Sequence, residues 1–433
     1  MKILAITAGA ADMYCGSCLR DNALAAELKR QGHDVLLLPL YTPTRTDEVN
    51  VSDPRLFFGG IRVYLELKTR FFRRRHPWID WVLDRPSLVR LLTRRAGATD
   101  PAMLGEFTVS VLQGEDGPHR IEVERLLEWL RREAPPDIVS LPYSLLIALA
   151  QPLRRELGCP VVCTLQGEEL FLDGLMEPYR SRALELIRAR VADVDAFLAV
   201  SRYEAVFMAG YLGIPPEKIH VTPLGIHLEG HGPVERPRGV GFRIGFLARV
   251  APEKGLHVLA EGFRTLCGRG LPVTLEAGGY LRAEHARYFA DIRRRIEEWG
   301  LGNRFRYHGE LSREEKIGFL RGLDVLSVPC IYEEPKGLFL LEAMANGVPV
   351  VQPMRGSFPE IVGQTGGGIL VEPDDPSALA TGILQVLEDP QLASRLRAAG
   401  PAGVRQHYSA AGMARRTLEV FSGALARARA NTA

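Results

Sequence analysis

The chain has 433 residues and a formal net charge of +2, with 24% of its residues charged and 46% hydrophobic. This composition is typical of a globular protein long enough to form two domains of roughly 200 residues each. The near-zero charge argues against a dedicated nucleic-acid binder, and no apolar run reaches the ~20 residues needed to span a bilayer.

The first half alternates between β-rich runs and amphipathic stretches. Strands are predicted at 3–7, 34–38, 137–141, 161–165 and 196–200, with helices at 19–31, 145–156 and 178–191. Helices at this spacing between strands indicate a parallel sheet with right-handed crossovers, which is the doubly wound α/β architecture.

The second half repeats this pattern. Strands are predicted at 243–246, 273–277, 305–308, 325–328, 348–351 and 368–371, with helices at 256–267, 283–298 and 410–428. Pro- and Gly-rich stretches interrupt both periodicities over 228–240, which we interpret as a linker. The predicted domains are therefore 1–227 and 241–408, followed by a terminal helix over 409–433.

The cysteine content and the amino-terminal sequence indicate the cellular location of the protein. Six cysteines in a chain of this length do not form a disulfide framework. Cys15 and Cys18 have redox- or metal-like spacing, but no second Cys/His pair matches them, so we interpret them as packing residues of a loop. The amino terminus enters a strand pattern directly and lacks a signal-peptide cleavage site. We expect a cytoplasmic protein.

A basic segment over 67–95 stands apart from this pattern. It carries nine Lys and Arg residues interleaved with aromatic residues, against two acids. Such a segment can rest on the anionic inner face of a membrane or guide an acidic acceptor. The alternative, which we favour, is an insertion whose arginines are solvated while its aromatic residues pack on the first domain.

The stretch 332–351 is the most informative part of the chain. Glu334 and Glu342 flank a turn and the start of an apolar helix, which begins near Gly337 and ends at Asn346. The first backbone N–H groups of a helix lack partners, so this end suits an anion or a sugar oxygen. Glu342 can accept two hydrogen bonds from a vicinal diol, and Glu334 can reach another part of the same ligand. The alternative is an ordinary helix start with solvated carboxylates.

This stretch resembles the donor-binding signature of the family 4 retaining glycosyltransferases (glycosyl transferases group 1). The resemblance lies in the seven residues between Glu334 and Glu342, the pair Gly337 and Leu338, and the run Glu-Ala-Met-Ala-x-Gly-Val-Pro-Val. It implies the GT-B fold, in which two Rossmann-like domains face each other across a cleft and the last helix crosses back to the first domain. It also implies a nucleotide-sugar donor, no metal ion and no further cofactor.

Arg249 and Lys254 lie in a loop between the first strand and the first helix of the second domain. Fixed cations aimed at a diphosphate leaving group stabilise the charge that develops as the glycosidic bond breaks. The surrounding Pro-Glu-Lys-Gly run resembles the family's phosphate-binding loop. The resemblance implies that Arg249, Lys254 and Glu334 are catalytic, and that Gly337, Leu338 and Glu342 complete the donor contacts.

The first domain offers candidates for the acceptor side. Related enzymes typically have a histidine where Gln166 stands; a glutamine cannot be a general base, although it can hold a hydroxyl or a carbonyl. Glu168 and Glu169 either bind the acceptor or form a solvated pair. Gly16 would let the backbone approach a phosphate or sugar, or it serves only the geometry of the turn.

Two further departures from the family pattern are His227 in the place of an aspartate and Lys336 in the place of a phenylalanine. We expect a hexosyltransferase that moves a sugar to an unidentified acceptor by a front-face mechanism, in which the departing phosphate takes the acceptor proton. A GT-B phosphorylase, a nucleotide-sugar epimerase and an inactive binding protein on the same scaffold are the alternatives. The intact Glu334/Glu342 and Arg249/Lys254 pairs favour the transferase.

Overall fold

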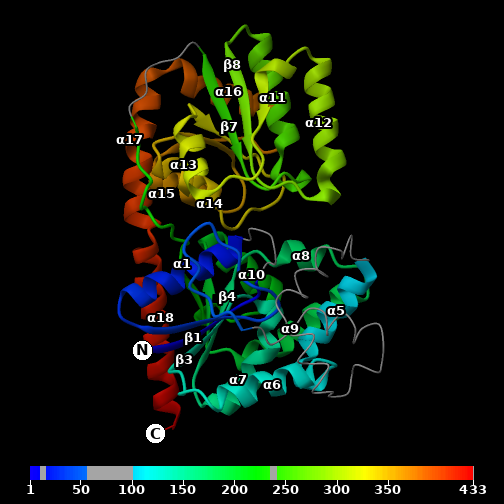
Figure 1. Cartoon of the computed structure of the whole chain (residues 1–433), viewed down its shortest axis with the longest axis vertical. Helices are drawn as coiled ribbons and strands as arrows, with labels where there is room; N and C mark the ends of the chain where they lie inside the picture. Colours follow the sequence, from blue (N-terminus) through cyan, green and yellow to red (C-terminus); the bar gives the residue numbers. More distant parts are fainter. Residues whose placement is uncertain (10–15, 56–100, 235–240, 433) are drawn as a thin grey trace. The chain divides into compact units, whose positions relative to one another are not determined.

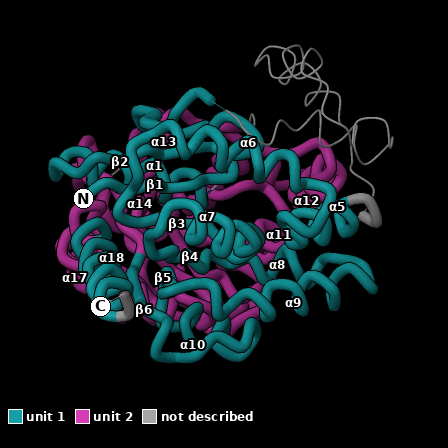
Figure 2. The backbone as a smooth tube through the Cα atoms, turned by 90° about the horizontal axis from the view of Figure 1, so that it is seen from below, with its two compact units in different colours: residues 1–223, 413–433 teal, residues 224–412 magenta. Residues whose placement is uncertain are grey.

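The computed structural model describes residues 1–9, 16–55, 101–234 and 241–432. The chain divides into two units, which Figure 2 shows in different colours: unit 1 comprises Met1–Pro223 and Met413–Ala433, and unit 2 comprises Leu224–Gly412. The predicted linker 228–240 lies within unit 2, and its second half, 235–240, is outside the described residues. The basic segment 67–95 is likewise outside them.

Unit 1 contains a six-stranded sheet in the order β2-β1-β3-β4-β5-β6, with every neighbouring pair parallel. The strands are β1 (Lys2–Thr7), β2 (Asp34–Pro39), β3 (Ile138–Leu141), β4 (Val161–Leu165), β5 (Ala196–Ala199) and β6 (Ile219–Val221). Five of them lie where the sequence predicts strands. The sequence predicts no strand at β6, because this three-residue edge strand is only half-buried and too short to show a period.

Helices cover both faces of this sheet (Figure 1). They are α1 (Gly16–Arg30), α5 (Pro101–Gln113), α6 (Arg120–Leu130), α7 (Ala150–Leu157), α8 (Glu169–Asp173), α9 (Tyr179–Ala189) and α10 (Arg202–Leu212). The helix predicted over 145–156 is a 3₁₀ segment, Ser144–Leu149, that continues into α7. Pro152 explains the break, because it lacks the N–H that a continuous α-helix would donate to the carbonyl of Ala148.

Two apolar clusters form the core of unit 1, one on each face of the sheet. Consecutive strand residues alternate between them, as Ile3 and Leu4 do, because a parallel sheet is buried on both faces. The last helix, α18 (Ala410–Thr432), belongs to unit 1 from Met413 onward. Its Phe421 is fully buried and packs in one cluster with Leu24 and Leu28 of α1. The final helix is therefore part of the core of the first unit.

Unit 2 contains a second six-stranded parallel sheet, in the order β12-β11-β10-β7-β8-β9. Its strands are β7 (Phe242–Leu247), β8 (Val273–Gly278), β9 (Phe305–Tyr307), β10 (Val325–Leu326), β11 (Val350–Pro353) and β12 (Gly368–Val371). Its helices are α11 (Leu256–Gly268), α12 (Ala286–Glu298), α13 (Arg313–Arg321), α14 (Leu338–Ala345), α15 (Phe358–Thr365), α16 (Pro376–Glu388) and α17 (Pro390–His407). The architecture of each unit is thus the doubly wound α/β fold that the sequence predicts.

Both sheets have a topological switch point, where successive connections leave in opposite directions. The switch lies between β1 and β3 in unit 1, and between β7 and β10 in unit 2. Ligands of open α/β sheets bind outside the carboxyl ends of the strands at such points. In the described part of the chain, no helix combines the length and the apolarity needed to cross a bilayer.

The packing of α18 generates a stability prediction. Replacement of Phe421 by Ala would leave a cavity in a core cluster, so we expect the free energy of unfolding to fall by about 3–5 kcal/mol. Chemical denaturation followed by circular dichroism measures this change. Ser422 is the next residue and is exposed, so Ser422→Ala is the matched control. Equal stability of the two variants would contradict the assignment of α18 to the core.

Candidate functional site

The loop that follows β7 presents Lys254 at the switch point of the second sheet. A short 3₁₀ turn, Pro252–Lys254, ends at Gly255, which has a φ of 75° and begins α11. A Cβ atom at Gly255 would lie 1.9 Å from the carbonyl oxygen of Pro329, so the loop packs too closely for any other residue. The Lys254 side chain is only 14% exposed.

Lys254 forms a buried ion pair with Glu334, which lies in the loop between β10 and α14. The hydroxyl of Tyr332 contacts both partners: it lies 2.7 Å from Lys254 Nζ and hydrogen-bonds the Glu334 carboxylate. The ammonium group also lies 4.9 Å from the centre of the Tyr332 ring, within reach of a cation–π interaction. Two residues predicted from the sequence as site residues, Lys254 and Glu334, are therefore in direct contact.

The remaining oxygens of Glu334 hold the start of α14 and the loop after β11. Its Oε1 accepts hydrogen bonds from the backbone N–H groups of Lys336 at 3.1 Å and of Gly337 at 3.5 Å. Its backbone carbonyl accepts from the Ser357 N–H at 2.8 Å and the Ser357 hydroxyl at 2.9 Å. The helix start that the sequence suggested for an anion thus receives the carboxylate of Glu334 itself.

Burial and ion pairing act in opposite directions on this carboxylate. Burial by itself raises the pKa of Glu334, but the charge of Lys254 and hydrogen bonds from Lys254 and Tyr332 outweigh burial and lower that pKa to about 2. Burial likewise lowers the pKa of Lys254, and the charge of Glu334 reverses the effect, so that the pKa of Lys254 is raised. Both groups are therefore charged at neutral pH.

Arg249 and Glu342 form separate ion pairs in the same unit. Arg249, which follows β7, is 39% exposed and pairs with Glu253 four residues later. Glu342 lies on α14, and its Oε1 is 2.5 Å from Nζ of Lys316 on α13. Among the described residues, the ion pairs of Arg249 and of Glu342 are thus distinct from that of Lys254 and Glu334.

Three residues of this region were not identified from the sequence. Tyr332 lies two positions before Glu334, and this closeness in the chain was the only sequence feature that could have marked it as a site residue. Glu253 lies within the phosphate-loop run but reads as a solvated acid. Lys316 lies 26 residues before Glu342 on another helix, and no local pattern could connect the two.

The candidates in unit 1 lie at the carboxyl ends of β3 and β4. Gln166 follows β4 directly, and its Nε2 donates to the carbonyl oxygen of Pro142 at 2.7 Å. Glu168 accepts from the N–H and the hydroxyl of Ser144 at 2.9 and 2.8 Å, and from the Gln166 N–H at 2.8 Å. Glu168 thus fastens two loops at this edge of the sheet.

The alternative of a solvated Glu168–Glu169 pair is wrong, because the two residues are only 6% and 7% exposed. Gly16 is the first residue of α1. Cys15 is outside the described residues, and Cys18 is buried with its Sγ 3.9 Å from the Thr7 hydroxyl. Within the described ranges, no group of three His, Cys, Asp or Glu side chains converges as a metal site would require.

The ion pair at Glu334 generates a pH prediction. The pKa of Glu334 is lower in the folded state than its ordinary value of 4.5, so its contribution to stability is present above pH 4.5 and is lost as pH falls towards 2. The lowered pKa corresponds to about 3 kcal/mol. Denaturant unfolding of wild type and Glu334→Gln between pH 7 and 2 measures it. We expect wild type to lose about that much more stability than the variant.

A double variant, Glu334→Gln with Lys254→Met, separates this effect from the cost of leaving Lys254 buried without a counter-charge, which is about 3–5 kcal/mol. We expect the double variant to be more stable than Glu334→Gln at pH 7. We also expect its free energy of unfolding to depend as weakly on acid pH as that of Glu334→Gln. A steep acid dependence in both variants would assign the effect to other carboxylates.

Two models of glycosyltransferase families match successive parts of the chain. The family model described as Glycosyl transferases group 1 matches residues 236–402, and the model described as Glycosyltransferase Family 4 matches residues 89–229. The 2-deoxystreptamine glucosyltransferase of Streptomyces kanamyceticus is 28% identical over 282 residues, which cover 60% of this chain and 70% of the relative.

Two further comparisons extend over more of the chain. The GDP-mannose-dependent alpha-(1-6)-phosphatidylinositol monomannoside mannosyltransferase of Mycolicibacterium smegmatis is 29% identical over 69% of this chain and 76% of its own length. The crystal structure of Anabaena Alr3699/HepE in complex with UDP and glucose aligns with 98% of this chain and all of its own, with a TM-score of 0.68 and 18% identity. The fold is therefore GT-B, and the chain belongs to the glycosyl transferases group 1, the family 4 glycosyltransferases.

Proposed function

We propose that this enzyme transfers a sugar from a nucleotide-diphosphate sugar to an acceptor, with retention of anomeric configuration. The observation that carries the proposal is the buried Lys254, held by Glu334 and Tyr332 at the switch point of the second sheet and accompanied by Arg249 after the same strand. The Anabaena protein of the same fold was solved with UDP and glucose, and the mycobacterial relative is named for GDP-mannose. Both support a nucleotide-sugar donor.

Lys254 and Arg249 would neutralise the departing diphosphate. An ammonium group has three N–H donors. Lys254 uses two of them on Glu334 and Tyr332, so that one remains for a phosphate oxygen. In the described part of the chain, Arg249 pairs with Glu253, and the two side chains are 39% and 23% exposed. Exposed ion pairs are weak, so a diphosphate can displace Glu253 from the guanidinium. Cations in these positions stabilise the transition state more than the ground state.

The start and middle of α14 would hold the rest of the donor. Lys316 fixes one carboxylate oxygen of Glu342, and the other is available to a ribose diol. Glu334 accepts from the amide of Gly337 and so sets the direction of the helix start. The following amide, that of Leu338, then faces the sugar or a phosphate oxygen. Glu334 positions the sugar through this loop and through Lys254.

On unit 1 we propose that Gln166 contacts the acceptor while Glu168 fixes the loop that carries it, and that the Gly16 backbone lies near a phosphate or sugar. Gln166 cannot take a proton, so the leaving phosphate accepts the acceptor proton in a front-face reaction. Arg249 and Lys254 supply the positive charge, and we propose that no metal ion is needed. We also propose a cytoplasmic location, with the membrane contact of 67–95 remaining a prediction from its composition.

Nucleotide binding tests the donor site. We expect one of UDP, GDP, ADP or CMP, or a sugar conjugate of it, to raise the Tm of wild type, because ligand that binds only the folded state stabilises it. Glu342→Ala should lose this shift, since the ribose contact is gone. Glu314 is exposed on neighbouring α13, and Glu314→Ala should keep the shift. A full shift in Glu342→Ala would remove Glu342 from the site.

Turnover tests the two cations. We expect Lys254→Ala and Arg249→Ala to lower kcat by about 10²-fold or more, as loss of a charge that stabilises the transition state does. The readout is donor hydrolysis or transfer over an acceptor panel, normalised to the folded fraction. Arg264 on α11 is 57% exposed, so Arg264→Ala is the control and should keep wild-type kcat. Near-normal turnover of either test variant would exclude the proposed phosphate site.

A further inference from the structure

A segment of unit 2, residues 227–233, is bound to both ends of α13, and we call it the strap. At the start of the helix, Nη2 of Arg313 donates to the carbonyl oxygens of His227 at 3.1 Å and of Glu229 at 3.0 Å. At the end of the helix, Arg321 donates to two further carbonyl oxygens of the strap at 2.7 and 3.1 Å. Hydrogen bonds from a guanidinium are charge-assisted, so these four hold the strap firmly to α13.

The same strap is bound to α14 through Asn346, which caps the end of that helix and is 3% exposed. Oδ1 of Asn346 accepts from the N–H of Gly232 at 3.2 Å, and Nδ2 lies 2.8 Å from Nδ1 of His231. Nδ2 also donates to the carbonyl oxygen of Glu342 at 2.9 Å. A single buried amide therefore joins the strap to the turn of α14 that carries Glu342.

Two glycines allow the strap to approach the helices closely. Gly347 follows Asn346 with a φ of 72°, and a Cβ atom there would lie 2.8 Å from Cβ of Pro233. A Cβ atom at Gly230, which has a φ of 79°, would lie 3.2 Å from Cδ1 of Ile317 on α13. Glycine adopts a positive φ without steric cost. The strap is therefore packed against both helices as well as hydrogen-bonded to them.

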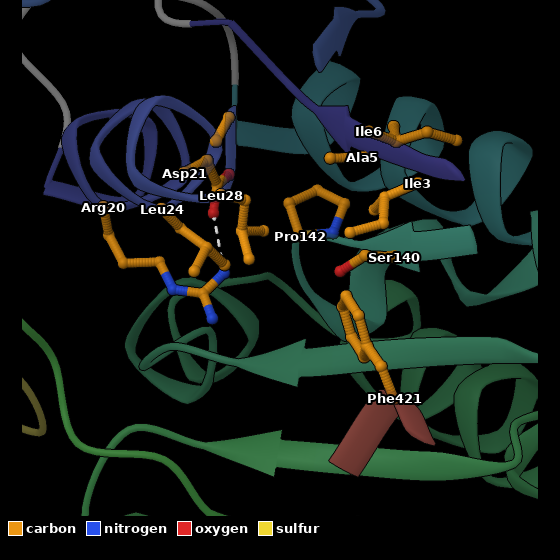
Figure 3. Close-up of a pocket in the computed structure, with 11 residues that line it drawn as sticks. Ile3, Ala5, Ile6, Arg20, Asp21, Leu24, Leu28, Ser140, Pro142 and Phe421 are labelled. Atoms are coloured by element: carbon orange, nitrogen blue, oxygen red, sulfur yellow. Dashed lines mark hydrogen bonds and ion pairs between the residues drawn. The ribbon is translucent and has the colours of Figure 1, made fainter. Parts of the chain in front are cut away.

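The residue before the strap is also fixed. The N–H of Ile226 donates to the carbonyl oxygen of Tyr408 at 2.9 Å, and its carbonyl oxygen accepts from the N–H of Ala410 at 2.9 Å. Ala410 begins α18. Figure 3 shows Phe421 of the same helix, which lines a cavity in unit 1 together with Ile3. The strap is thus held at its start by an anchored helix and along its length by α13 and α14.

We propose that the strap positions the ribose contact of the donor site, with Asn346 and Arg321 as positioning residues. The ion pair of Lys316 and Glu342 joins α13 to α14 at 2.5 Å, so the direction of the Glu342 carboxylate depends on how the two helices are spaced. The strap fixes that spacing because it binds both helices. This inference rests on the proposed function, in which Glu342 binds the ribose diol.

Discrimination between ribose and deoxyribose tests the strap. UDP, GDP and ADP are titrated by calorimetry beside their 2′-deoxy forms, which lack one hydroxyl of the diol. We expect wild type to bind its ribonucleotide about tenfold or more tightly than the 2′-deoxy form, as one hydrogen bond to a charged group implies. Asn346→Ala and Arg321→Gln should each lower this ratio to about threefold or less, because only the ribonucleotide loses a contact. An equal loss of affinity for both forms would overturn the proposal, since it indicates general damage to the site.

Arg304 provides a matched control, because it too binds a carbonyl oxygen of a neighbouring loop. Its Nη1 lies 3.3 Å from the carbonyl oxygen of Leu271. The two residues precede β9 and β8, at the amino ends of the strands, so Arg304→Gln should keep the wild-type ratio. Arg321→Lys keeps a charged donor for the strap and should lose less discrimination than Arg321→Gln. Equal ratios in Arg304→Gln and Arg321→Gln would overturn the proposal.

Turnover separates positioning from catalysis. Both test variants should raise the donor KM and keep kcat, since Lys254 and Arg249 are unchanged. A fall in kcat without a change in KM would contradict a positioning role. If Asn346→Ala does not fold, Arg321→Gln, whose side chain is half-buried, decides the result.

The binding experiment also distinguishes this inference from the proposed function. If no nucleotide binds wild type, the proposed function and the strap both fail. If wild type binds ribonucleotide and 2′-deoxy form equally, Glu342 does not contact the ribose and the role of the strap falls with it, while the nucleotide-dependent transferase stands. Discrimination that persists in both Asn346→Ala and Arg321→Gln would refute the strap alone.

Discussion

The ion pair of Lys254 and Glu334 determines how the site of unit 2 is built. Removing two charges from water is costly, and the cost is offset only when the pair is close and its remaining groups are hydrogen-bonded. Here Tyr332 contacts both partners, and two backbone amides complete the carboxylate. The pair thereby connects the loop after β7 with the loop after β10, and Ser357 adds the loop after β11. Three loops of unit 2 are thus held together around one ion pair.

The parallel sheets explain why the side chains of the candidate site lie at the carboxyl ends of the strands. All carboxyl ends lie on one edge, and successive connections diverge at the switch point, which leaves room for side chains of different loops to meet. Lys254 and Glu334 meet in this way in unit 2. In unit 1 the same construction brings Gln166 within hydrogen-bond distance of Pro142 and next to Asp21. The two sheets use one topology to assemble two different groups of residues.

Sequence patterns predicted those features of the structure that depend on residues close together in the chain. Strand runs such as those of β1, β4 and β7 are apolar and bounded by turns, and the helix between Gly337 and Asn346 has a clear start and end. The spacing of Glu334 and Glu342 and the loop with Arg249 and Lys254 are equally local. Long-range pairing is not encoded in such patterns, which is why the Lys316–Glu342 contact was not foreseen.

Burial of charged groups was also hidden from the sequence. Arg20 lies in a helix whose sequence mixes charged and apolar residues, and nothing in the sequence indicates that its side chain lies beneath the surface. From the sequence, Glu168 and Glu169 are equally compatible with solvated acids, whereas the structure shows both side chains buried at the edge of the sheet. The strand β6 was missed because three half-buried residues show no period. Tertiary contacts decide these features, and a single sequence does not display them.

The different burial of the charge pairs implies different roles. The pairs of Lys254 and Lys316 with their glutamates are each largely buried, with side chains at most 16% exposed. Buried pairs fix geometry, because separating them leaves a charge without compensation. Arg249 and Glu253 are more exposed and therefore bound more weakly. In the proposed reaction a diphosphate would displace Glu253 and leave Glu334 in place, so that Lys254 would be the fixed cation and Arg249 the one that exchanges its partner.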